Sequence, residues 1–220
     1  MVMATKTSTA AGISLTSVTL EVNDLAAARA FYHAFGVDEY VRLQASQAPS
    51  TGFRGFTVAL TVSQPSTVDG FVGAAVEAGA LVLKPASKSF WGYGGVVQAP
   101  DGTIWKIATS AKKNTGPDTR TVDEVVLLLG VEDVKATKQC YVGQGLSVAK
   151  SFGGKYVEFA PAANSPVKLA LYKRAALAKD LGVPADGTGA HRIVLGGATD
   201  GFTDLDGFVW EAAPPAGETR

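Results

Sequence analysis

Short apolar stretches that alternate with polar residues recur along the whole chain and predict strands separated by helices. Such stretches predict strands at residues 14–22 and 122–131. Each is followed within two residues by an aspartate, Asp24 or Asp133, which can cap a helix that then ends at a glycine. The chain therefore contains the same beginning twice, made of a strand, a turn and a helix.

The likeness between these two beginnings extends to individual residues. Six residues recur 109 positions further on, namely Leu20, Val22, Asp24, Ala27, Tyr32 and Gly36 as Leu129, Val131, Asp133, Ala136, Tyr141 and Gly145. Three more recur 105 positions further on, namely Asp101, Gly102 and Trp105 as Asp206, Gly207 and Trp210. Repeated matches in a constant register indicate a duplicated unit, and the change of offset indicates gaps within it.

Both copies end in a predicted β-hairpin. In the first copy the hairpin pairs residues 96–99 with 103–109 around the turn Pro100-Asp101-Gly102. In the second copy it pairs residues 201–203 with 208–212.

The middles of the two copies differ. The first copy has one predicted strand within residues 40–53, a strand at 55–62 and an amphipathic helix at 68–78. The second copy has no counterpart of that helix, but it has strands at 155–160 and 167–173 and a helix at 175–181. Each copy has therefore lost an element that the other retains.

These patterns divide the chain into five segments. We predict a flexible N-terminus at 1–13, a first half at 14–109, a polar linker at 110–121, a second half with a shortened second module at 122–213, and a tail at 214–220.

Composition excludes several classes of function. The 20 Lys and Arg residues balance the 20 Asp and Glu residues, so no net charge attracts nucleic acid. No apolar run approaches the length of about 18 residues that a membrane-spanning helix needs, and the N-terminus lacks the apolar core of a signal peptide. The single cysteine, Cys140, fits a reducing cytoplasm and aligns with Phe31, which predicts a core position. We expect a cytoplasmic protein without nucleic-acid or membrane partners.

Several of the repeated residues belong to longer motifs. They are Leu20-Glu21-Val22-Asn23-Asp24-Leu25, Phe31-Tyr32 with Gly36, and the stretch from Ser89 through Gly95 to Pro100-Asp101-Gly102-Thr103-Ile104-Trp105. Together they resemble the vicinal oxygen chelate superfamily, which includes glyoxalase I, extradiol dioxygenases and bleomycin-resistance proteins. The resemblance implies an α+β fold in which paired βαβββ modules form cupped mixed sheets with a ligand cavity on the concave face, here as two tandem incomplete halves.

The resemblance also implies metal ligands at the start of the first strand and the end of the last strand of each module. These places carry Ser17, Thr57, Lys106, Val126, Arg192 and Glu211. A lone carboxylate does not hold a divalent ion, and the charge of Lys106 repels one. We therefore expect a lost metal site and no cofactor. If the register slips by one residue, Glu211 and His191 are the remaining candidates for a metal.

Three aromatic residues, Phe90, Trp91 and Tyr93, alternate with glycines directly before the predicted hairpin. They either stack on a flat ligand or pack around a glycine-mediated bend in the strand. Trp105 and Trp210 are expected in the core, because alternation turns them away from Lys106 and Glu211.

The leading hypothesis is a binding or sequestering protein of the bleomycin-resistance type that holds a small, largely apolar or aromatic molecule without metal. Its predicted cavity residues are Ser17, Thr19, Phe90, Trp91, Tyr93, Lys106, Val126 and Glu211. The alternative is a lyase, isomerase or dioxygenase of the same superfamily, working with metal through Glu211 and His191 or without metal through Lys106 and Glu211 as a catalytic pair. A monomer is expected, because two halves supply the modules of a cavity that two subunits often share, and a homodimer remains possible.

Overall fold

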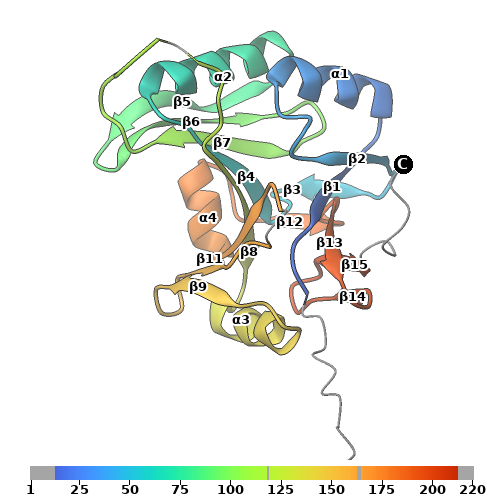
Figure 1. Cartoon of the computed structure of the whole chain (residues 1–220). Coiled ribbons are helices and arrows are strands. Elements are labelled where there is room, and N and C mark those ends of the chain that lie inside the picture. The colour runs from blue at the N-terminus through green and yellow to red at the C-terminus, as the bar shows by residue number, and fades with distance from the viewer. Residues whose placement is uncertain (1–12, 118, 163–164, 213–220) are drawn as a thin grey trace, which may run out of the picture.

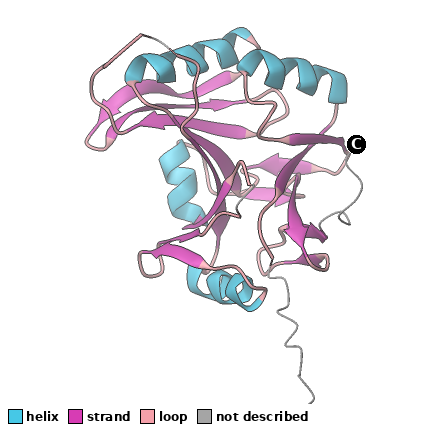
Figure 2. Ribbon diagram, viewed as in Figure 1, coloured by secondary structure: helices cyan, strands magenta, loops and turns pink. Residues whose placement is uncertain are grey.

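The computed structural model describes residues 13–117, 119–162 and 165–212. The predicted flexible N-terminus, apart from Ile13, and the predicted tail lie outside the described residues. The described strands form two main sheets and a small two-stranded ribbon (Figures 1 and 2).

The smaller main sheet has five strands in the order β14-β15-β13-β1-β2, which span Phe202–Thr203, Val209–Ala212, Ile193–Ala198, Ser17–Val22 and Arg42–Ala45. The larger sheet has eight strands in the order β5-β6-β7-β4-β8-β11-β10-β9. These span Leu81–Ser89, Gly92–Gln98, Ile104–Thr109, Phe56–Thr61, Glu124–Val131, Lys168–Lys173, Tyr156–Phe159 and Val148–Ser151. Each main sheet combines strands from both repeats, so the duplicated modules pair across the midpoint of the chain.

Four helices complete the described part of the fold: α1 at Leu25–Phe35, α2 at Pro65–Glu77, α3 at Val134–Gly143 and α4 at Arg174–Leu181. The predicted caps begin both repeated helices, since the Asp24 side chain accepts from the Ala27 N–H at 2.9 Å and Asp133 accepts from the Lys135 N–H at 2.8 Å. Gly36 ends α1 with a φ of 81°, a left-handed conformation that favours glycine.

The main core lies between α1, α2 and α3 and the outer faces of the sheets. Trp105 and Trp210 are fully buried, as predicted from their alternation with Lys106 and Glu211. The Trp105 ring contacts Tyr32 and Phe35 of α1, and the Trp210 ring contacts Tyr141 of α3. Alternation along the strands then places Lys106 and Glu211 on the inner faces.

A second, smaller core lies on the inner face of the larger sheet, under α4. Leu177, Ala178 and Leu181 of this helix pack with Val96 and Ile104 of the sheet. Figure 1 shows α4 beneath the sheet, opposite to α1 and α2. The α4 helix therefore fills part of the concave surface on which the family resemblance predicts a ligand cavity.

The α+β class, the cupped mixed sheets and both predicted hairpins are confirmed. The last module lacks a helix, as predicted, because β13 passes to β14 within three residues. The prediction of one strand within residues 40–53 is wrong, because this stretch forms β2 and also β3, at Ser50–Gly52. The β3 strand was missed because Ser-Thr-Gly has no hydrophobic alternation; it is held by antiparallel pairing with β12, at Gly187–Gly189.

The segment predicted as a polar linker is exposed but fixed to the first repeat. The buried Gln64 side chain accepts from the Thr115 and Gly116 N–H groups at 2.8 and 3.0 Å. Its amide also donates to the Pro117 carbonyl at 2.8 Å. None of the helices in the described ranges has the length and apolarity needed to span a bilayer.

Candidate functional site

The inner face of the larger sheet brings together part of the predicted cavity. Backbone register places Lys106 and Val126 on either side of Ala59, and Lys168 beyond Val126, so these four residues form one cross-strand row. The Lys106 ammonium donates to the Asp180 carboxylate of α4 at 2.5 Å, and Lys168 makes an ion pair with Glu124.

A pocket of about 260 Å³ opens beside this row, between β5, β6, β7 and the end of α4. Gly94 and Ala108, which are paired across β6 and β7, form a floor without large side chains. Lys106 and Asp180 stand on one side, and Trp91, which is 81% exposed, stands at the hairpin tip. We refer to this site as the inner-face pocket.

Of the two other aromatic candidates, Tyr93 belongs to the lining of the inner-face pocket and Phe90 does not. Phe90 contacts the edge of the Trp91 ring at a centroid distance of 5.0 Å and lies under the Lys112 ammonium, outside the lining. The Tyr93 hydroxyl donates to Asp69 of α2 at 2.7 Å, and α2 covers the opposite face of the sheet. Tyr93 therefore borders the pocket while its hydroxyl is bound on the α2 side of the sheet, and stacking on a ligand stays a prediction.

The remaining predicted cavity residues belong to the smaller sheet. Ser17 and Glu211 are paired with the same residue, Gly196, from opposite sides, and Thr19 is paired with Val194 in the next row of that face. The eight predicted residues thus lie on two different sheets and do not form one cavity. The prediction was wrong on this point because each half contributes strands to both sheets.

The chemistry of these rows does not fit the divalent metal that the fold family implies. The row on the larger sheet offers two ammonium groups and two hydrocarbon side chains, and the row on the smaller sheet offers one hydroxyl and one carboxylate. His191 precedes β13, about 10 Å or more along the strand from the Gly196 row that holds Glu211. Within residues 13–117, 119–162 and 165–212, no cluster of three or more His, Cys, Asp or Glu side chains could hold an ion.

The pair of Lys106 and Glu211 is likewise not assembled. The two residues occupy different sheets, and Lys106 is already bound to Asp180. A proton shuttle between them has no geometric basis.

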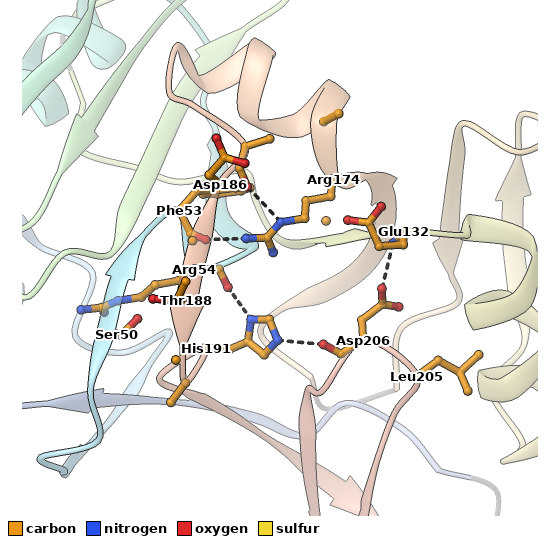
Figure 3. Close-up of a pocket in the computed structure, with 16 residues that line it drawn as sticks. Ser50, Phe53, Arg54, Glu132, Arg174, Asp186, Thr188, His191, Leu205 and Asp206 are labelled. Carbon is orange, nitrogen blue, oxygen red and sulfur yellow. Dashed lines mark hydrogen bonds between the residues drawn. The ribbon is translucent and has the colours of Figure 1, made fainter.

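The largest of the described cavities, about 630 Å³, lies elsewhere, between the two sheets (Figure 3). It is bounded by the ends of β8 and β11, the β3–β12 ribbon and the β14–β15 turn, and we refer to it as the inter-sheet pocket. His191 lines it, with Nδ1 2.5 Å from the Arg54 carbonyl oxygen and Nε2 2.9 Å from that of Asp206. Its polar side chains also include Arg174 and Glu132, which sequence reasoning missed.

One signal could have found the latter two residues. Lys173 lies opposite Val131 where β11 and β8 run parallel, so the residues that follow, Arg174 and Glu132, leave the sheet at the same edge. The signal is the parallel pairing of β11 with β8. It cannot be recognised from two separate hydrophobic stretches in the sequence, so Arg174 and Glu132 could be identified only once the sheet topology was known.

Comparison with solved structures gives the fold but not the reaction. Glyoxalase I from Zea mays superimposes with a TM-score of 0.55 and 12% identity, over 90% of this chain and 91% of that one. A dioxygenase candidate from Bacillus subtilis gives a TM-score of 0.56 and 11% identity, over 93% and 86% of the two chains. No family model and no curated protein sequence matches the chain.

Proposed function

We propose that this chain, which has the glyoxalase and dioxygenase fold of the vicinal oxygen chelate superfamily, is a small-molecule binding protein of the bleomycin-resistance type. Its ligand is a flat, largely apolar or aromatic molecule, held in the inner-face pocket without a divalent metal.

The observation that carries the proposal is the combination of groups around the pocket. The Gly94 and Ala108 floor lets a flat ring lie close to the backbone, and Trp91 provides an exposed aromatic face next to it. Lys106 has three N–H donors, of which Asp180 takes one, so the others can bind a polar group of the ligand. The volume of about 260 Å³ is below the usual range of about 300 to 1,000 Å³ for small-molecule sites, so the ligand must be small.

The proposal extends to the oligomeric state of the protein and to its cellular compartment. Both main sheets already contain strands from both repeats, which supports a monomer as the working unit. A sedimentation experiment that gives a dimer mass would overturn this part. The single, partly buried Cys140 supports a reducing compartment such as the cytoplasm.

Titration with naphthoate, an aromatic carboxylate, and with naphthyl methanol, its neutral analogue, tests the proposal by calorimetry. Trp91→Ala should weaken binding of both by about tenfold, the equivalent of 1.4 kcal/mol of lost stacking. Lys106→Met should weaken naphthoate more than naphthyl methanol.

Phe152→Ala is the matched control, because Phe152 is also an exposed aromatic residue but lies outside the pocket. This control should bind both probes as the parent does. Equal affinity of Trp91→Ala and the parent would overturn the assignment of the site.

A further inference from the structure

Several charged side chains line the inter-sheet pocket, and among them are two polar groups without a hydrogen-bond or ion-pair partner in the described part of the chain. These groups are the Nη1 atom of Arg174 and the carboxylate of Glu132, and Figure 3 shows both side chains directed into the same cavity. They reach it from the ends of the neighbouring strands β11 and β8.

Arg174 is held rigidly in its position. Its Nε donates to the Ala185 carbonyl at 3.1 Å, its Nη2 donates to the Phe53 carbonyl at 2.6 Å, and the guanidinium lies 5.2 Å from the centroid of the Phe53 ring. Nη1 lies against Gly55, in the space that a Cβ would take, and donates to nothing among residues 13–117, 119–162 and 165–212. A fixed guanidinium with a free N–H edge is suited to bind a carboxylate.

The His191 imidazole lies beside this edge. Its two ring nitrogens face the carbonyl oxygens of Arg54 and Asp206, which can only accept. The imidazole also borders Gly55, next to Arg174.

Glu132 supplies the opposite charge. Its backbone N–H donates to the Asp206 carboxylate at 2.8 Å, which fixes the residue, while its own exposed carboxylate takes part in no ion pair or hydrogen bond given for the described residues. The remaining lining includes the apolar side chains of Leu205, Ala175 and Ala185, and also the charged side chains of Arg54, Asp186 and Asp206.

We propose that the inter-sheet pocket binds a zwitterion, an α-amino acid with an apolar side chain. The ligand carboxylate binds Arg174 Nη1 beside His191, and its ammonium group binds Glu132. A ligand with both charges complements Arg174 and Glu132 together, whereas a simple anion or a simple cation complements only one of the two. This proposal does not depend on the inner-face pocket, which lies on other strands.

Calorimetry with leucine, isocaproate and isoamylamine tests the proposal, because the last two lack only the amine and only the carboxylate, respectively. The parent protein should bind leucine at least about tenfold more tightly than either analogue. Glu132→Gln should remove the preference for leucine over isocaproate, leaving the two within about twofold. Glu132 is exposed, so folding of this variant, checked by circular dichroism, should be unaffected.

Two control variants separate this site from the rest of the molecule. Glu77→Gln, at another exposed carboxylate, and Trp91→Ala, in the inner-face pocket, should both keep the preference of the parent. The proposal is overturned if leucine shows no binding up to about 10 mM. It is equally overturned if isocaproate binds the parent as well as leucine does, or if Glu132→Gln keeps the preference.

Discussion

Each repeat contains one hydrogen bond between a helix tyrosine and an aspartate, which we call the clasp. The two repeats differ in their unrepeated helices, α2 and α4, which lie on opposite faces of the larger sheet (Figure 1). In the first repeat the Tyr32 hydroxyl of α1 donates to Asp101 at 2.8 Å, and in the second the Tyr141 hydroxyl of α3 donates to Asp204 at 2.5 Å. The first repeat adds α2 outside the larger sheet, whereas the second adds α4 inside it. The repeated tyrosines therefore bind an aspartate in each repeat, although Asp204 stands two residues before the sequence counterpart of Asp101, and the position of the unrepeated helix decides how much of the concave face is open.

The largest loss of stability is expected from the two buried tryptophans that pack against the clasp tyrosines. Trp105→Ala and Trp210→Ala should each lower the free energy of unfolding by about 3 to 5 kcal/mol, because each removes a fully buried indole. The loss should be larger at Trp105, which packs under α1 with α2 beside it, than at Trp210, whose neighbour Phe202 is only partly buried. Urea denaturation measures both. A larger loss of unfolding free energy for Trp210→Ala than for Trp105→Ala would contradict this order.

Replacing a buried residue of α4 tests whether this helix is a fixed part of the fold. Leu181→Ala should cost about 2 to 4 kcal/mol of unfolding free energy, because Leu181 is fully buried against the larger sheet. Lys179→Ala, at an exposed position of the same helix, is the control and should be close to neutral. If Leu181→Ala costs no more than this control, α4 does not pack on the inner face.

The hydroxyls of the two clasps should contribute unequally. Tyr32→Phe and Tyr141→Phe should each cost about 1 to 3 kcal/mol. The loss should be larger for Tyr141, because its hydroxyl also accepts from Trp210 Nε1 at 3.2 Å and its partner Asp204 is buried. The Oδ2 atom of Asp101, in contrast, retains a bond from the Thr103 hydroxyl, whereas the remaining bonds of Asp204, from the Asp206 and Phe208 N–H groups, go to its Oδ1 atom. Chemical denaturation of both variants gives the order, and the opposite order would contradict this account.

A smaller effect concerns pH. Burial raises the pKa of the Asp204 carboxyl, although bonds from the Tyr141 hydroxyl and the Phe208 and Asp206 N–H groups oppose the rise. A raised pKa stabilises the folded state below the usual value of about 3.9, and this contribution is lost as pH rises through the folded-state pKa. The measured quantity is the unfolding free energy of the parent minus that of Asp204→Asn. It should fall as pH increases from about 3.9 through the raised folded-state pKa of Asp204.

Tyr141→Phe sharpens this test. It removes one of the bonds that lower the pKa of Asp204, so in this background the fall should move to higher pH. Denaturation at a series of pH values follows both curves. A difference that rises with pH would contradict the assigned direction.

Much of the fold was readable from the sequence because each repeat encodes it locally. The apolar alternation of β1 and β8, the capping aspartates and the alternation of Trp105 with Lys106 depend only on neighbours in the chain. These features gave the repeated modules, the hairpins and the buried tryptophans.

The sites were only partly predictable because they depend on pairings over long distances. Trp91, Lys106 and Val126 belong to the larger sheet, and the sequence could not show that Ser17 and Glu211 belong to the other one. The helix 175–181 was expected, yet its position on the inner face follows from tertiary packing of Leu177 and Leu181. Arg174 and Glu132 were missed because only the parallel pairing of β11 with β8 brings them together.

The central claim is that the inner-face pocket binds its ligand without a divalent metal, because two lysines and two hydrocarbon side chains occupy the row where ligands are expected. The most direct measurement is the affinity for naphthoate before chelator treatment, after it, and after one equivalent of a divalent metal is added back. We predict the same affinity in all three states. Loss of binding after chelation, with recovery on addition of the metal, would contradict the account.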